Sequence, residues 1–191
     1  MRIGNVAGLG VALLLLSGCS ATSVSNTPDS STPAAPAALA TTDAPTPTTE
    51  TPAVARVGDA ITLKGSADGS EIAVVVTNVV DPTKSTDGFS TPTAGNRYVA
   101  VQFRITNTGT AAYTDAPMNG AKVADADGQQ FTSTVVMSVA AGPTFPVTLA
   151  LIPGGKALGY IVFQVPTTSK ITAVQFGMDS GFGSTGEWAV S

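Results

Sequence analysis

The sequence predicts an all-β fold, a two-layer antiparallel β-sandwich preceded by a signal peptide and a disordered stalk. From residue 57 onward, short β-rich runs are separated by glycine, proline, asparagine and aspartate. Apolar and polar side chains alternate along several of these runs, which is typical of a strand with one buried face. No window of this region keeps an apolar period of about 3.6 residues, so long helices are not expected.

The first eighteen residues have the organisation of a signal peptide. Arg2 supplies a positive charge, and residues 6–16 form an uninterrupted run of apolar residues and glycine. As a helix this run would rise about 16 Å, roughly half of a membrane's hydrocarbon core, so it is too short for an ordinary spanning helix. We therefore assign residues 1–18 to a signal peptide that directs export.

The end of the apolar run, Leu16-Ser17-Gly18-Cys19, resembles the lipobox of bacterial lipoproteins at every position. The resemblance implies cleavage before Cys19, lipidation of its thiol and anchoring to the cell membrane at the extracytoplasmic face. The alternative is a free cysteine left by an ordinary secretory cleavage. Lipidation is favoured because Cys19 is the only cysteine of the chain and lies at the expected end of the run.

Residues 19–55 comprise this cysteine and a stalk rich in threonine, alanine, proline and serine. Residues 20–55 contain three acids, no basic residue and no aromatic residue. Such a segment buries too little apolar surface to fold, so disorder is expected. It would span about 35 Å as flexible coil and up to about 110 Å in polyproline conformation. The composition fits an O-glycosylated stalk and a bare spacer equally well.

Residues 56–191 are expected to form the sandwich. Candidate strands lie at 59–64, 71–80, 97–107, 121–125, 129–133, 146–152, 157–165, 171–178 and 187–190. The run at 97–107 alternates best. Its expected core face carries Val99, Val101, Phe103 and Ile105. Its expected solvent face carries Tyr98, Ala100, Gln102, Arg104 and Thr106.

The turns between the runs agree with antiparallel pairing of consecutive strands. Asn107-Thr108-Gly109 and Asp127-Gly128 supply residues that tolerate a positive φ, and Pro153-Gly154-Gly155 favours a sharp reversal.

Several of these strands and turns resemble a known family. They are Val57-Gly58-Asp59, Val79-Val80-Asp81-Pro82, Gly95-Asn96-Arg97-Tyr98-Val99-Ala100-Val101, Ile105-Thr106-Asn107-Thr108-Gly109, residues 123–131, Ile152-Pro153-Gly154-Gly155-Lys156 and residues 160–166. In this order they look like the immunoglobulin-like domain of unknown function of exported actinobacterial and firmicute lipoproteins, often mislabelled as a telomeric repeat-binding factor. More loosely, the domain resembles the secreted mycobacterial immunogenic antigens.

This resemblance covers essentially all of 56–191 and implies an immunoglobulin-like antiparallel β-sandwich and export. It supplies no catalytic or binding residue, because its motifs are strands and turns. Residues 137–145 depart from the family pattern.

Composition argues against several functions. The chain carries a net charge of −4 and has no basic cluster, so nucleic acid is not an expected partner. It has no histidine, and its one cysteine is assigned to the anchor, so the common nucleophile and base arrangements and Cys/His zinc sites are not expected. The acids lie mainly at turns, where aspartate bonds the local backbone. We therefore expect neither an enzyme nor a cofactor.

One stretch resembles the start of a calcium loop. In Asp125-Ala126-Asp127-Gly128, alternate carboxylates precede a glycine, but Gln129, Gln130 and Phe131 follow where further oxygen ligands are needed. A hairpin turn is the favoured interpretation, and no metal site is predicted.

The longer loops carry large apolar side chains: Phe89, Met137, Phe145 and Phe182. We expect these to cap the ends of the core rather than form a recognition surface, and Trp188 to lie in the core or at a sheet edge. The functional hypothesis is a non-catalytic cell-envelope module that binds another protein or a cell-wall component. The alternative is a carrier or sensor of a small apolar ligand, which an apolar cavity of about 300 Å³ or more would favour.

The lipid anchor can be tested at Cys19. The substitution Cys19→Ser removes the only thiol of the chain, so the protein should move from the membrane fraction to the soluble exported fraction. Partitioning into detergent, compared between the wild type and the variant, measures this shift. Unchanged partitioning of the variant would refute lipid anchoring.

Overall fold

The computed structural model describes residues 54–190. The signal peptide, Cys19 and the stalk up to residue 53 lie outside the described residues. Their assignments therefore stay predictions.

The described chain is built almost entirely of strands. The elements are β1 (Ala60–Lys64), β2 (Glu71–Thr83), β3 (Asn96–Asn107), β4 (Tyr113–Asp115), α1 (Pro117–Gly120), β5 (Ala121–Asp125), β6 (Gln130–Thr134), β7 (Leu149–Leu151), β8 (Lys156–Pro166), β9 (Ile171–Gly177), the 3-10 turn η1 (Asp179–Gly181) and β10 (Thr185–Ala189). Each strand predicted from the sequence is present. The short elements β4, α1 and η1 were not predicted.

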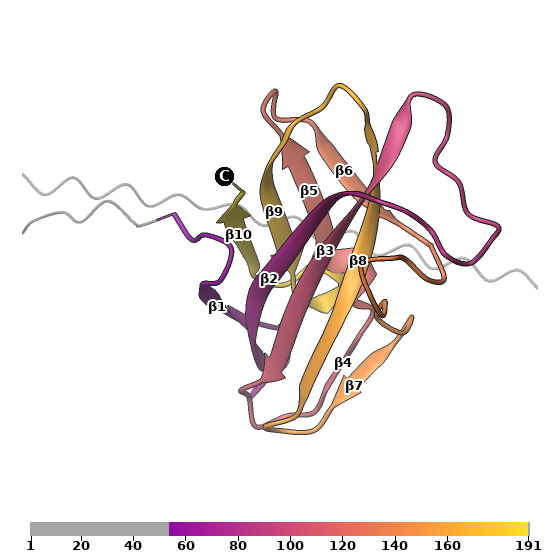
Figure 1. The fold of residues 1–191 in the computed structure, drawn as a ribbon. Coiled ribbons are helices and arrows are strands. Elements are labelled where there is room, and N and C mark those ends of the chain that lie inside the picture. Colours follow the sequence, from indigo (N-terminus) through magenta and orange to yellow (C-terminus); the bar gives the residue numbers. More distant parts are fainter. Residues whose placement is uncertain (1–53, 191) are drawn as a thin grey trace, which may run out of the picture. The chain divides into compact units, whose positions relative to one another are not determined.

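Eight of the strands form one continuous hydrogen-bonded sheet in the order β1-β2-β3-β8-β6-β5-β9-β10. It bends into two facing layers, one made of β1, β2, β3 and β8 and the other of β6, β5, β9 and β10 (Figure 1). The layers are joined where β6 pairs with β8, at Ser133 with Phe163 and Thr134 with Val162. All neighbours in this sheet are antiparallel. The predicted all-β antiparallel sandwich is confirmed.

The opposite edge of the sandwich is covered by the start of the described chain. Arg56 forms a parallel bridge with Ala189, and the Ala189 amide donates to the Ala55 carbonyl at 2.8 Å. The indole Nε1 of Trp188 donates to the Asp59 carbonyl at 2.9 Å. The N-terminal segment thus connects the edge strands β1 and β10.

The core lies between the two layers. Val99, Val101, Phe103 and Ile105 of β3 are all fully buried, as the alternation predicted. The rings of Phe103 and Phe176 lie 5.4 Å apart between centroids, so β3 contacts β9 across the core. Trp188 is also fully buried.

The other face of β3 differs from the prediction. Tyr98 and Ala100 were expected in solvent, yet both are buried in a second apolar cluster. The cluster includes Val136, Val139, Tyr160 and Val162. The prediction was wrong because the β6–β7 loop packs over this end of the sheet. Arg104, farther along β3, is exposed as predicted.

The same loop supplies an irregular neighbour for β8. The Phe145 amide donates to the Tyr160 carbonyl at 3.1 Å, and the Tyr160 amide donates to the Pro143 carbonyl at 2.9 Å. These bonds satisfy backbone groups of β8 without a regular strand. Within residues 137–145, which the family pattern did not place, Pro143, Thr144 and Phe145 therefore form an irregular neighbour of β8.

The register of β3 can be tested with two adjacent substitutions. Phe103→Ala should lower the free energy of unfolding by about 3–5 kcal/mol, because it removes buried surface and leaves a cavity. Arg104→Ala should change it by less than about 0.5 kcal/mol, because its side chain is exposed. Denaturant melts measure both values. Equal losses, or a larger loss for the arginine variant, would contradict the assigned inner face.

Candidate functional site

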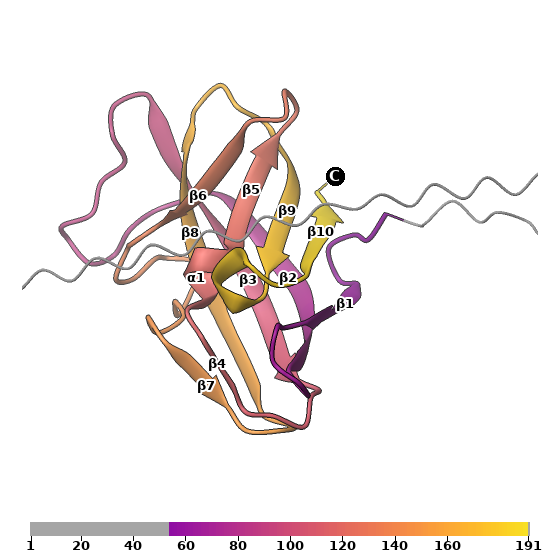
Figure 2. The same ribbon diagram turned by 180° about the vertical axis from the view of Figure 1, so that it is seen from behind.

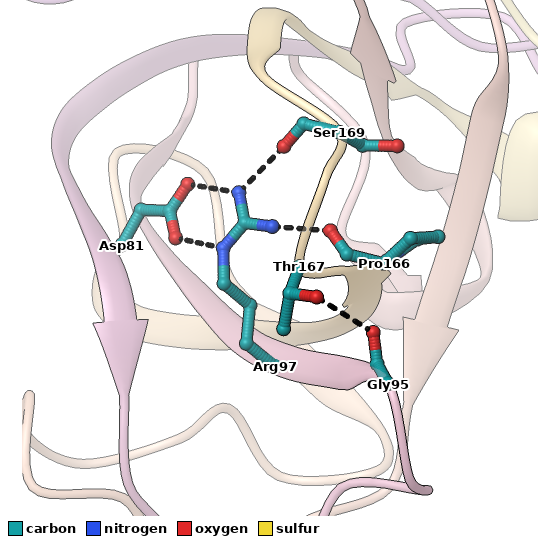
Figure 3. A network of polar contacts seen from close by, with 6 residues as sticks. All are labelled: Asp81, Gly95, Arg97, Pro166, Thr167 and Ser169. Carbon is teal, nitrogen blue, oxygen red and sulfur yellow. Dashed lines mark hydrogen bonds and ion pairs between the residues drawn. The ribbon is translucent and has the colours of Figure 1, made fainter.

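The first polar cluster is centred on Arg97 at the start of β3 (Figure 3). Its Nε donates to Asp81 Oδ1 at 2.6 Å and its Nη2 to Asp81 Oδ2 at 2.8 Å. Nη2 also donates to the Ser169 carbonyl at 2.8 Å, and Nη1 donates to the Pro166 carbonyl. The hydrogen bond with Asp81 raises the pKa of Arg97. Arg97 thus fastens the β8–β9 turn to the end of β2.

This cluster has little capacity left for a ligand. Four hydrogen bonds occupy the guanidinium, and the side chains of Arg97 and Asp81 are only 17% and 27% exposed. Beside them, the Thr167 hydroxyl and amide both donate to the Gly95 carbonyl, at 3.1 and 2.9 Å. The arrangement stabilises turns and offers no open polar site.

A second group of motif residues surrounds Asn107, which is almost completely buried. Its Nδ2 donates to the carbonyls of Ala111 and Leu151 at 2.9 and 3.0 Å, and its Oδ1 accepts from the Gly109 amide at 3.0 Å. Neither Asn107 nor Gly109 has a positive φ, contrary to the expectation for this turn. Glycine is needed at 109 because a Cβ would lie 2.1 Å from the Gly69 carbonyl oxygen.

The stretch that resembles a calcium loop forms the predicted hairpin turn. Asp125 Oδ1 accepts from the amides of Asp127 and Gln129 at 3.1 and 2.9 Å, and Gly128 has a φ of 81°. The Asp125 carboxylate therefore caps the turn between β5 and β6. Among residues 54–190, no group of three or more His, Cys, Asp and Glu side chains is placed to hold a metal.

The clearest candidate binding site is an apolar groove of about 200 Å³, which we call the β6–β7 groove. It is lined by Met118, Thr134, Val135, Val136, Met137, Thr144, Phe145, Pro146, Val147, Tyr160, Ile161 and Val162. The buried β8 residues form part of its wall. Val135, Met137 and Val147 are 70%, 76% and 72% exposed, so apolar side chains at the groove face solvent.

The expected capping role is wrong for three of the four apolar loop residues. Phe89, Met137 and Phe182 are 91%, 76% and 94% exposed. Phe145 alone packs against the core, next to Gly159, where a Cβ would lie 2.9 Å from its ring. Within the β6–β7 loop, Phe145 packs against the core and Met137 stays outside it. The sequence showed these residues in the longer loops but not whether they gather into a patch, which is what marks an interaction site.

Asp87 connects the loop that carries Phe89 to the β6–β7 groove. Its carboxylate accepts from the hydroxyls of Ser85 and Ser90, from the amides of Phe89 and Ser90, and from the Met137 amide at 3.2 Å. Hydrogen bonds from Ser90, Phe89 and Ser85 hold the pKa of Asp87 far below its usual range. The exposed side chains of Phe89 and Met137 are thus presented by hydrogen-bonded loops.

The fold and these turns define an immunoglobulin-like β-sandwich domain in which the sequence motifs hold the turns in place. The chain belongs to the family described as "Domain of unknown function (DUF4352)", whose model matches residues 63–187. This match confirms the resemblance inferred from the motifs. A comparison with curated proteins finds no match.

Several solved structures are similar to the chain. MPT63, a secreted protein of Mycobacterium tuberculosis, has a TM-score of 0.50 and 18% identity over 74% of this chain and 99% of its own. An uncharacterised β-sandwich protein of Clostridium difficile has a TM-score of 0.41 and 13% identity over 76% of this chain and 100% of its own. The candidate lipoprotein ycdA of Bacillus subtilis has a TM-score of 0.48 and 13% identity, over 66% of this chain and 38% of its own. The likeness to MPT63 shows a shared fold. In the part of the chain that the structure describes, no helix is long and apolar enough to cross a membrane.

The role of Arg97 can be tested by replacing it with another cation. Arg97→Lys keeps the charge but loses the two-pronged contact with Asp81 and the bonds to two carbonyls. It should lower the free energy of unfolding by about 1–2 kcal/mol. The loss is no larger because the side chains of Arg97 and Asp81 are partly exposed to solvent. Arg104→Lys on the same strand is the matched control and should cost less than about 0.5 kcal/mol. Urea melts followed by the fluorescence of Trp188, the only tryptophan, compare the two. Similar losses would show that Arg97 does not hold the turns.

Proposed function

We propose that the protein is an exported lipoprotein, anchored to the extracytoplasmic face of the cell membrane through lipidated Cys19. Its sandwich domain is a non-catalytic module that binds another envelope protein or a cell-wall component. The lipobox at 16–19 supports the anchor. MPT63, which shares the fold, is itself described as a secreted protein, which agrees with export.

The β6–β7 groove is the observation that carries the binding role. Val135, Met137 and Val147 expose apolar surface around a depression that could receive an apolar side chain of a partner. Hydrogen bonds to Asp87 and Ser138 restrain the loops on one side of the groove, so less conformational entropy is lost on binding. A partly ordered apolar groove on a rigid scaffold suits recognition of a protein surface.

The polar groups support a role without catalysis. The carboxylates of Asp81, Asp87 and Asp125 accept hydrogen bonds that hold turns and loops together. The chain contains no histidine to act as a general base near neutral pH. These three carboxylates are therefore engaged in structural contacts.

The second candidate is a carrier or sensor of a small apolar ligand. The groove is apolar and is the natural place for such a ligand, but its volume of about 200 Å³ is below the range of about 300–1,000 Å³ typical of small-molecule pockets. The size thus favours an inserted side chain over a carried molecule. Native mass spectrometry of the protein extracted from cells would detect a retained apolar molecule and decide for the carrier.

Crosslinking in intact cells tests the binding role with two matched variants. Val147→Asp places a charge in the groove, whereas Ile152→Asp places one at a residue that is 75% exposed and does not line it. Mass spectrometry should recover a specific partner with the wild type and the Ile152 variant. Recovery with the Val147 variant should fall about tenfold, equivalent to about 1.4 kcal/mol of binding. Equal recovery with both variants would place the interaction elsewhere.

A further inference from the structure

The β2–β3 loop (residues 84–95) carries a phenylalanine that the core of the domain does not use. Phe89 is 91% exposed, and it is not among the residues that line the β6–β7 groove of its own chain. Its backbone is nevertheless restrained, because the Asp87 carboxylate accepts from the amides of Phe89 and Ser90 at 2.9 and 2.8 Å. Aromatic side chains are enriched in protein interfaces, and a restrained loop loses less entropy on binding. Phe89 is therefore presented as a contact residue.

The same hydrogen bonds place Phe89 at the rim of the β6–β7 groove. The second oxygen of the Asp87 carboxylate accepts from the amide of Met137, which lines the groove, at 3.2 Å. One carboxylate thus holds the backbones of both Phe89 and Met137. The Thr86 amide also donates to the Ser138 carbonyl at 3.0 Å. Figure 2 shows the β2–β3 loop beside the β6–β7 loop (residues 135–148) at one edge of the sandwich.

The groove has the size and the lining to receive a phenyl ring. Engineered apolar cavities of about 150 Å³ bind benzene in other proteins, so a groove of about 200 Å³ has room for such a ring. None of the side chains that line it is charged, and Phe145, Ile161 and Val162 supply apolar contacts. Because Phe89 stays outside the groove of its own chain, a ring that fills the groove comes from another molecule.

The distribution of charge fits a second copy of the chain at this surface. The chain carries a net charge of −4, so two copies repel each other over most of their surfaces. Around the groove this repulsion is weak, because residues 135–148 carry no charged side chain and residues 84–95 carry only Lys84 and Asp87, which are opposite in sign. An aromatic side chain and a groove that lie together on one face can be exchanged about a two-fold axis, since each copy then fills the groove of the other.

We propose that the occupant of the β6–β7 groove is Phe89 of a second copy, and that two chains form a symmetric dimer by exchanging this side chain. The inference rests on the proposed binding role of the groove and names its partner. Two exchanged aromatic side chains bury about 150–250 Å² each, well below the roughly 1,200 Å² of the smallest stable interfaces. The exposed side chains of Val135, Met137 and Val147 add to the contact. The dimer is therefore weak in solution, and anchoring of both copies on one membrane through Cys19 raises their effective concentration.

Cysteine crosslinking in intact cells tests the exchange. Two differently tagged full-length copies are co-expressed, one with Phe89→Cys and the other with Val147→Cys, a position that lines the groove. A short bismaleimide should join the two introduced thiols and give a heterodimer that carries both tags. Pairing Val147→Cys with Phe182→Cys, at a side chain that is 94% exposed and does not line the groove, should give little product. Any product formed through Cys19, the only native cysteine, would appear equally in both pairs.

A further substitution measures the contribution of the ring. Adding Phe89→Ala to the Val147→Cys copy removes the remaining inserted ring, so the yield with the Phe89→Cys copy should fall about tenfold. Phe182→Ala in the same copy is the matched control and should leave the yield unchanged. Equal yields from the Phe89 and Phe182 pairs, or an unchanged yield with Phe89→Ala, would overturn the exchange.

The outcome also separates this inference from the binding role on which it rests. If the heterodimer is absent and Val147→Asp still loses a different crosslinked protein, the exchange is overturned but the groove keeps its binding role. If the heterodimer is absent and Val147→Asp loses no partner, both fail.

Discussion

Contact between the two sheet layers is the interaction on which the rest of the structure depends. Phe103 of β3 meets Phe176 of β9 in a core that includes Trp188. The only cysteine of the chain is Cys19, so no disulfide links the layers. Burial of apolar surface must therefore supply the stability that many small extracellular domains obtain from disulfides. This explains why the inner face of β3 is completely closed to solvent.

Polar side chains then fix the turns around this core. Arg97, Asn107 and Asp125 each bond several backbone or side-chain groups of neighbouring segments. All three belong to the motifs by which the family is recognised. The family pattern therefore records how the turns are held and gives no direct indication of a ligand. The β6–β7 groove, which has capacity for a partner, lies mostly outside those motifs.

The strands could be predicted because their β-rich runs are local in sequence, and in β2 the buried residues alternate with partly exposed ones. The burial of Tyr98 could not be predicted, since it depends on Val139 from a distant loop. The exposure of Phe89 and Phe182 was also misjudged, since a large apolar side chain in a loop does not by itself show whether another segment packs over it. β4 and η1 are absent from the sequence prediction, so the contact between Asp115 and Ser180 could not be inferred. The lipobox at Cys19 is continuous in sequence, and it could be identified without a structure.

The entry of the chain along β10 has a mechanical consequence. With the proposed anchor at Cys19, any pull between membrane and domain would reach the sandwich first at Ala55 and Arg56. The force would act there on the bridge between Arg56 and Ala189. It would also act on the hydrogen bond from the Trp188 indole to the Asp59 carbonyl, and both contacts join the segment to the core. The same segment occupies the edge of β10, where an unpaired strand would otherwise be open to pairing with another molecule. One short stretch of backbone thus both connects the domain to its proposed anchor and protects the edge of β10.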